Sequence, residues 1–194
     1  MRIRRQNCSL RDPGPGALKT GRRGFLRSVG AAAASLLPVG AACARAAETR
    51  SLSFVHTHTG ESLSAVYFRS GDYQPAGLER INHLLRDFRT DETRAIDTRV
   101  LDILFDLQVR MNRDEPYQVI SGYRSPHTNA ELRSHSSGVA EHSLHMQGQA
   151  IDVRVSGFAT RKLRELALQM GRGGVGFYPQ SDFVHLDCGR VRYW

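Results

Sequence analysis

Cysteine is scarce in this sequence, because the 194-residue chain contains only 3 cysteines. Two of them, Cys8 and Cys43, fall in an N-terminal segment that we assign below to a leader, which leaves Cys188 alone in the remainder. One cysteine cannot form an internal disulfide. We therefore expect the mature domain to be stabilised by its hydrophobic core, and further by a metal ion if it binds one.

The sequence also lacks internal repeats, low-complexity stretches and, beyond residue 46, any long apolar run. The same part of the chain has no excess of charge. The formal net charge of +8 belongs to residues 1–46, which hold nine Lys or Arg and one Asp, so that 27 − 9 = 18 basic and 19 − 1 = 18 acidic residues remain. A formally neutral mature chain argues against nucleic acid as a partner. The remaining 194 − 46 = 148 residues suit one compact domain.

Residues 1–46 have the pattern of a bacterial export signal. Residues 21–27 read GRRGFLR, a twin-arginine pattern, and an apolar run rich in alanine and leucine follows. Residues 44–46 read ARA, with small side chains where a signal peptidase cleaves, so we predict a leader over 1–46 and a mature domain over 47–194. The apolar run is too short for a durable membrane span. The paired arginines predict export to the periplasm by the twin-arginine machinery. The alternatives are an ordinary Sec signal and a lipoprotein acylated at Cys43.

The mature chain has segments in which apolar residues alternate and others in which they recur at helical spacing. Asp97 is a suitable N-cap for one helix, and Gly171 a suitable C-cap for another. Strands are expected at residues 51–57, 63–69, 117–121, 150–155, 174–178 and 183–187. Helices are expected at residues 78–88, 97–111, 129–135 and 160–170. Because strands and helices do not alternate strictly, we predict an α+β fold with a small, mostly antiparallel sheet, helices packed on one side and a metal cleft on the sheet.

Two segments near the C-terminus gather residue types that bind zinc. Residues 143–152 read SLHMQGQAID, and residues 182–187 read DFVHLD. On the expected strands Asp152 and His185 alternate with apolar neighbours, so both side chains should face away from the core, while His145 precedes the first strand on a loop. Three N/O ligands and an open position for water are typical of hydrolytic zinc sites. We therefore predict that His145, Asp152 and His185 bind zinc, the alternative being that these are hydrogen-bonded structural residues.

Further polar residues are candidates for the chemistry around such a metal. A carboxylate near the zinc-bound water can collect its proton, and both Asp182 and Asp187 lie close to His185 in the sequence. We favour Asp182, at the mouth of the expected strand. Arg124 follows a strand and a glycine, where it could stabilise an oxyanion or hold a substrate carboxylate, or else pair with a nearby acid. His142 is a candidate fourth ligand or a partner of a ligand.

These motifs resemble a known group of peptidases. The pattern SxHxxGxAxD followed by an acid-x-x-His resembles zinc peptidases that act on D-amino-acid bonds, a superfamily that includes D-Ala-D-Ala carboxypeptidases and hedgehog-like domains. The segments THTGE, INHLLRD, ISGYRSP, SLHMQGQAIDV and SDFVHLD, spread over nearly the whole mature chain, resemble the murein endopeptidase K family of periplasmic peptidoglycan hydrolases. The resemblance implies that His145, Asp152 and His185 bind zinc, that Asp182 is the base and that Arg124 lies in the substrate site.

The hypothesis that follows is a monomeric periplasmic zinc endopeptidase that hydrolyses peptide cross-links of peptidoglycan. The resemblance suggests bonds of the stem-peptide bridge that involve meso-diaminopimelate, and it leaves open whether the bond is of the D-Ala–diaminopimelate or the diaminopimelate–diaminopimelate type. One alternative is a carboxypeptidase that trims terminal D-Ala. Another is a non-catalytic wall-binding domain with a structural zinc, whose site should be closed by four protein ligands.

Overall fold

The computed structural model describes residues 48–136 and 138–194. The predicted leader lies outside these residues. The described strands are β1 (Thr49–His56), β2 (Ser62–Arg69), β3 (Asp72–Tyr73), β4 (Tyr117–Ser121), β5 (Ala150–Val155), β6 (Gly174–Tyr178), β7 (Phe183–Asp187) and β8 (Arg192–Tyr193). The helices are α1 (Pro75–Leu84), α2 (Thr98–Met111), α3 (Pro126–His135) and α4 (Thr160–Met170), and a 3₁₀ turn, η1 (Leu144–Gln147), precedes β5.

The helix ends have local causes that the sequence contains. Asp97 caps α2 by accepting a hydrogen bond from the backbone N of Arg99 at 3.0 Å. Ser125 caps α3 in the same way, and Pro126 fills the first turn, where its missing N–H has no partner to lose. The helix therefore begins before the predicted residue 129. Conversely, α1 begins at Pro75 and ends at Leu84, earlier than the predicted 78–88.

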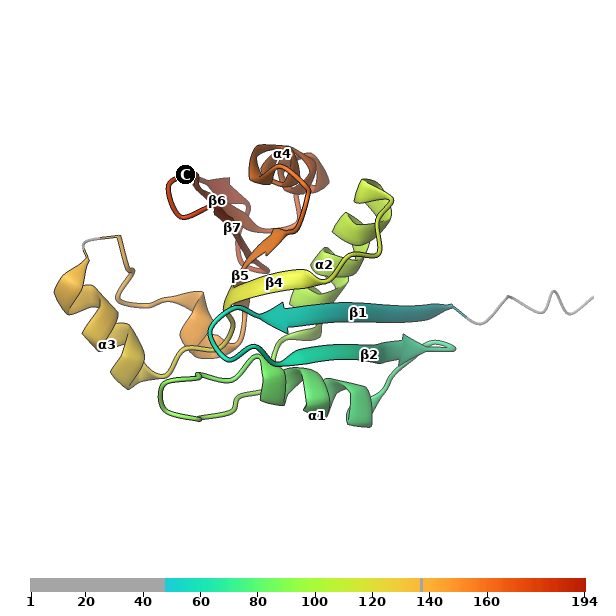
Figure 1. The fold of residues 1–194 in the computed structure, drawn as a ribbon, viewed down its shortest axis with the longest axis horizontal. Coiled ribbons are helices and arrows are strands. Elements are labelled where there is room, and N and C mark those ends of the chain that lie inside the picture. Colours follow the sequence, from blue (N-terminus) through green and yellow to red (C-terminus); the bar gives the residue numbers. More distant parts are fainter. Residues whose placement is uncertain (1–47, 137) are drawn as a thin grey trace, which may run out of the picture. The chain divides into compact units, whose positions relative to one another are not determined.

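The strands form one sheet in the order β3-β2-β1-β4-β5-β7-β6-β8 (Figure 1). Five of its pairings are antiparallel, and two, β1 with β4 and β6 with β8, are parallel. The prediction of an α+β fold with a mostly antiparallel sheet is confirmed. The two-residue strands β3 and β8 were not predicted, since two residues cannot display an alternating pattern.

A single hydrophobic core joins the sheet to three of the helices. The helices α1, α2 and α4 supply Ile81, Leu104 and Leu163, each fully buried, to the same cluster as the inward side chains of the central strands. Figure 1 shows α1 beside β2 and α4 beside β6 and β7. The buried hydroxyl of Tyr117 on β4 donates a 2.8 Å hydrogen bond to the carbonyl oxygen of Leu104, which ties α2 to the sheet.

The polar residues of interest lie on the opposite sheet face from this core. In β5 the side chains of Ile151 and Val153 enter the core, so that of Asp152 points the other way. In β7 the same alternation turns His185 away from the core. The antiparallel register sets Asp152 directly opposite His185. The described helices include none long and apolar enough to cross a bilayer.

Candidate metal centre

Three side chains from three elements meet on this sheet face, and we call them the His–Asp–His group: His145 from η1, Asp152 from β5 and His185 from β7. The short η1 turn orients the first of them. Gly148 ends η1 with a positive φ of 67°, and a Cβ atom there would collide with the carbonyl oxygen of Ala95. Only glycine allows this close backbone contact.

The distances within the His–Asp–His group fit a small tetrahedral cation. His185 Nδ1 lies 2.8 Å from Asp152 Oδ1 and 3.1 Å from His145 Nε2, and the third separation, from His145 Nε2 to Asp152 Oδ1, is 3.3 Å. Ligands about 2.0–2.1 Å from a tetrahedral zinc ion are separated by roughly 3.3–3.4 Å. The three donor atoms therefore need to move by only a few tenths of an ångström to share one ion.

In each histidine ring, the nitrogen that points away from the His–Asp–His group already has a hydrogen-bond partner. His145 Nδ1 lies 2.7 Å from the carbonyl oxygen of Gly122, and His185 Nε2 lies 3.1 Å from Asp187 Oδ2. Both oxygens can only accept, so each of these nitrogens carries a hydrogen, and the other nitrogen of each ring points into the His–Asp–His group. Such outer partners are typical of metal-binding histidines.

The ionisation of the His–Asp–His group also suits a cation. Burial lowers the pKa of His185, but its hydrogen bonds to the carboxylates of Asp152 and Asp187 outweigh this effect and raise the pKa to about 9. Burial raises the pKa of Asp152, but the charge and hydrogen bonds of His145 and His185 outweigh it and hold this pKa well below its usual range. Without a metal, a proton on His185 takes the place of the cation beside the Asp152 carboxylate.

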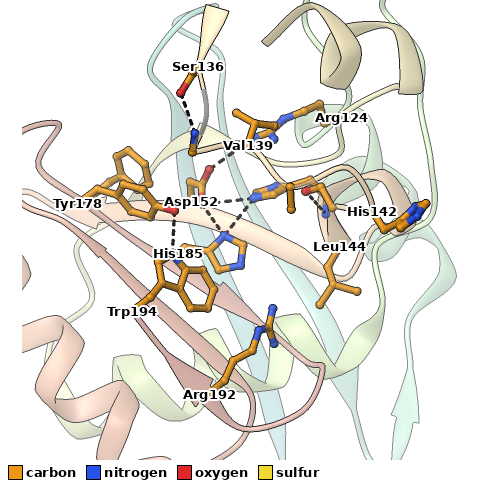
Figure 2. A pocket seen from close by; sticks show the side chains of 15 residues that line it. Arg124, Ser136, Val139, His142, Leu144, Asp152, Tyr178, His185, Arg192 and Trp194 are labelled. Atoms are coloured by element: carbon orange, nitrogen blue, oxygen red, sulfur yellow. Dashed lines mark hydrogen bonds and ion pairs between the residues drawn. The ribbon is translucent and has the colours of Figure 1, made fainter. Parts of the chain in front are cut away.

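The His–Asp–His group forms the floor of a cleft of about 410 Å³, the His–Asp–His cleft, shown in Figure 2. Its walls come from the segment between α3 and β5, from the β6–β7 hairpin and from the chain around β8. The lining residues are Arg124, Ser136, Gly138, Val139, Ala140, His142, Ser143, Leu144, His145, Asp152, Tyr178, Phe183, His185, Arg192 and Trp194.

Arg124 is a buried cation in the wall of the His–Asp–His cleft. Its side chain is 12% exposed, and its Nη2 lies 3.8 Å from Asp152 Oδ2. Its hydrogen bonds to Ser121 and Asn129 are long, at 3.4 Å each, and its Nε has no partner among the described residues. Burial lowers the pKa of Arg124, with the charge of Asp152 opposing this effect. A buried guanidinium with so few close partners can donate hydrogen bonds to an anionic group of a ligand.

The structure does not bring Asp182 into the His–Asp–His cleft. Its side chain is 61% exposed and belongs to the turn between β6 and β7, where it accepts a 2.8 Å hydrogen bond from Thr160 Oγ1 and approaches Arg154 Nη1 at 3.7 Å. Asp182 lines a separate groove with these two residues. Asp182 belongs to the turn that precedes β7 and has a positive φ of 51°, so the alternation of side chains along the strand does not determine its direction. This position gives no support to the prediction that Asp182 is the base.

The two other candidates have different surroundings. Asp187 shares the face of His185, but its side chain is 0% exposed and both oxygens are occupied by hydrogen bonds, so it offers no oxygen to water in the cleft. His142 lines the cleft, yet Figure 2 shows its ring pointing away from Asp152 and His185. Among residues 48–136 and 138–194, the metal-binding group that contains His145 has three members and His142 is not one of them.

Several lining residues were not predicted, namely Tyr178, Arg192 and Trp194. The indole Nε1 of Trp194 donates a 2.9 Å hydrogen bond to the Tyr178 hydroxyl, and its ring centroid lies 5.2 Å from that of His185. Gly176 makes this possible, since a Cβ atom there would come within 2.7–2.9 Å of the indole ring. The only sequence signal was the aromatic residue itself.

Comparisons with known proteins bear on the chemistry of this cleft. The sequence model of a family described as "Peptidoglycan L,D-endopeptidase MepK" matches residues 44–194. The chain belongs to this family. It is 45% identical over 145 residues to the peptidoglycan L,D-endopeptidase MepK of Escherichia coli strain K12, covering 75% of this chain and 80% of that protein. It is 39% identical over 146 residues to a probable peptidoglycan L,D-endopeptidase MepK of Haemophilus influenzae, covering 75% and 78%. The resemblance stated from the motifs is confirmed.

Proposed function

We propose that this protein is a periplasmic zinc endopeptidase that hydrolyses peptide cross-links of peptidoglycan. The observation that carries the proposal is the His–Asp–His group, with three ligand atoms within 4.8 Å of one another at the floor of a cleft, in a chain of the MepK family. Three protein ligands with room for solvent are the arrangement of catalytic zinc, whereas structural zinc sites have four.

The metal ligands in this proposal are His145, Asp152 and His185, two imidazole nitrogens and one carboxylate oxygen, a donor set that suits zinc. When bound there, zinc would supply a Lewis acid and a water of lowered pKa. The chain surrounds this centre with hydrogen-bond acceptors: Gly122 and Asp187 accept from the outer nitrogens of the two rings, and Asp152 provides a buried negative charge.

Arg124 is the proposed substrate-binding cation. Its poorly paired guanidinium lines the cleft beside Asp152 and can donate hydrogen bonds to a developing oxyanion or to a substrate carboxylate. Stem peptides are rich in carboxylates, which gives the buried positive charge a partner of matching chemistry. No role in proton transfer is assigned to Asp182, because its carboxylate lies outside the cleft.

Stereochemistry favours one of the two cross-link types as the bond that this protein cleaves. The relatives are named L,D-endopeptidases, which denotes a bond whose acyl group belongs to an L centre and whose amine belongs to a D centre. A diaminopimelate–diaminopimelate bridge contains such a bond, whereas a D-Ala–diaminopimelate bridge joins two D centres. We therefore propose the former as the substrate. The twin-arginine pattern at residues 21–27 supports export to the periplasm, and we expect the mature protein to be a monomer.

A digest of muropeptides that contain both cross-link types tests the proposal, with products separated by chromatography and identified by mass. We expect the wild-type protein to split the diaminopimelate–diaminopimelate dimers only, and Asp152→Asn to be inactive. Release of free D-Ala from uncrosslinked stems would instead identify a carboxypeptidase. Binding of the dimers without any cleavage, by a protein that contains zinc, would identify a wall-binding domain.

A further inference from the structure

The side chain of Asp187 occupies a position behind the His–Asp–His group that no chemical step of the proposed function uses. It is fully buried and negatively charged, and it lies 3.1 Å from the ring nitrogen of His185 that faces away from the metal site. We propose that Asp187, held by Arg192, is a positioning residue that fixes the ring and tautomer of His185 for metal binding. This inference rests on the metal site proposed above.

Every hydrogen-bonding direction of the Asp187 carboxylate is used. Oδ2 accepts from His185 Nε2 and, at 2.7 Å, from Arg192 Nη2. Oδ1 accepts from Arg192 Nη1 at 3.0 Å, from the backbone N of Gly189 at 2.9 Å and from that of Gly174 at 3.1 Å. A carboxylate with hydrogen bonds to both oxygens cannot rotate freely, so the imidazole that donates to it is held in one orientation.

The same contact determines which nitrogen of His185 can bind a metal. A carboxylate paired with arginine remains an acceptor, so His185 Nε2 must donate and carries the hydrogen. Nδ1 is then the only ring nitrogen that can offer a lone pair to a metal ion, and this atom lies 2.8 Å from Asp152 Oδ1 in the His–Asp–His group. Without Asp187 the ring could flip or change tautomer, and the fraction of molecules ready to bind metal would fall.

Arg192 reaches Asp187 because of the short strand β8, which pairs with β6 so that Arg192 lies beside Gly174. Gly174 leaves the space for the ion pair, since a Cβ atom there would clash with the Asp187 carboxylate and come within 2.6 Å of Arg192 Nη1. Thus β8 acts on His185 through the ion pair between Arg192 and Asp187.

Zinc affinity is the property that tests this inference independently of activity. We would measure zinc dissociation constants by competition with a chelating dye for the wild type, Asp187→Ala, Asp187→Asn and Arg192→Met. We would also record the visible absorption of the Co²⁺-loaded proteins and the melting temperature of the metal-free proteins. Arg190→Met is the matched control, because Arg190 is an exposed arginine two residues before Arg192.

We expect Asp187→Ala to weaken zinc binding about 10–100-fold and to change the Co²⁺ spectrum. Asp187→Asn should retain part of the affinity, because its amide oxygen can still accept from His185 Nε2. Arg192→Met should weaken binding several-fold, and Arg190→Met should match the wild type. If Asp187→Ala does not fold, Arg192→Met decides, since that side chain is 31% exposed and can be truncated with less damage.

Zinc affinities within twofold of wild type for Asp187→Asn and Arg192→Met, with lowered metal-free melting temperatures, would mean that the ion pair is only structural, and would overturn the inference. A wild-type protein that binds no zinc would instead overturn the proposed function on which it rests. The two failures are therefore distinguishable in one set of measurements.

Discussion

The substitution Asp182→Asn distinguishes two expectations for this residue. The motif resemblance implies that Asp182 is the catalytic base, whereas the structure places its carboxylate outside the His–Asp–His cleft. The carboxylate is 61% exposed, accepts one hydrogen bond from Thr160 and lies 3.7 Å from Arg154 in a groove outside the His–Asp–His cleft. An exposed ion pair contributes about 0–1 kcal/mol and a hydrogen bond about 1 kcal/mol. Because the amide can retain the hydrogen bond from Thr160, we expect the free energy of unfolding to fall by about 1 kcal/mol or less.

The catalytic effect should be small for the same reason. A general base contributes typically 10²–10⁴-fold to the rate, whereas we expect Asp182→Asn to stay within about threefold of wild type, a barrier change below about 0.7 kcal/mol. The assay is the initial rate of cleavage of crosslinked muropeptide dimers, followed by chromatography. Thr160→Val is the matched control, because it removes the same hydrogen bond from the other side.

A loss of hundredfold or more in Asp182→Asn, with zinc content, melting temperature and the rate of Thr160→Val unchanged, would refute this reasoning. Asp182 would then have to reach the cleft in the complex with substrate, and the β6–β7 turn would have to rearrange. A modest and equal loss of cleavage rate in both variants would show that Asp182 only stabilises this turn, through its hydrogen bond to Thr160 at the start of α4.

Four further outcomes are expected. Elemental analysis should find about one zinc ion per mature chain, lost in His145→Ala and His185→Ala. Zinc affinity should rise with pH by about tenfold per unit up to pH about 9, because His185, whose pKa is raised, must lose its proton when zinc binds. Competition titrations from pH 6 to 10 measure this dependence, and an affinity that does not change with pH would contradict it. Arg124→Ala should lower kcat/KM by about 10²–10³-fold with zinc content unchanged. In Gly176→Ala the added methyl should displace Trp194, the only tryptophan of the chain, which shifts its fluorescence emission.

Much of the fold was predictable because local patterns determine it. The alternation of Ile151 and Val153 around Asp152 predicts both the strand and the face of the carboxylate, and the structure agrees. Asp97 predicted the start of α2, and Gly171 the end of α4, each through a capping arrangement that depends on neighbouring backbone groups alone. These features require no knowledge of distant parts of the chain.

The rest depends on contacts between segments far apart in sequence. The surroundings of Asp187 depend on β8, a two-residue strand that exists only because β6 offers it an edge. Trp194 becomes part of the cleft wall because Gly176 leaves room for its ring. Asp182 is a different case, because it belongs to the turn before β7, where the alternation of a strand does not apply. Its role as the base stays a prediction, which Asp182→Asn tests.

The His–Asp–His group ultimately depends on the register of two strands. Asp152 faces His185 because the flanking pairs, Ile151 with Leu186 and Val153 with Val184, are buried together on the core side. A slip of one residue would send these apolar side chains to the cleft and the ligands into the core, at the cost of burying an unpaired carboxylate. The hydrophobic core therefore stabilises the sheet and, by the same pairs, sets the distance between two of the three proposed ligands. Substitutions at these core pairs should weaken metal binding even though none of them touches the ion.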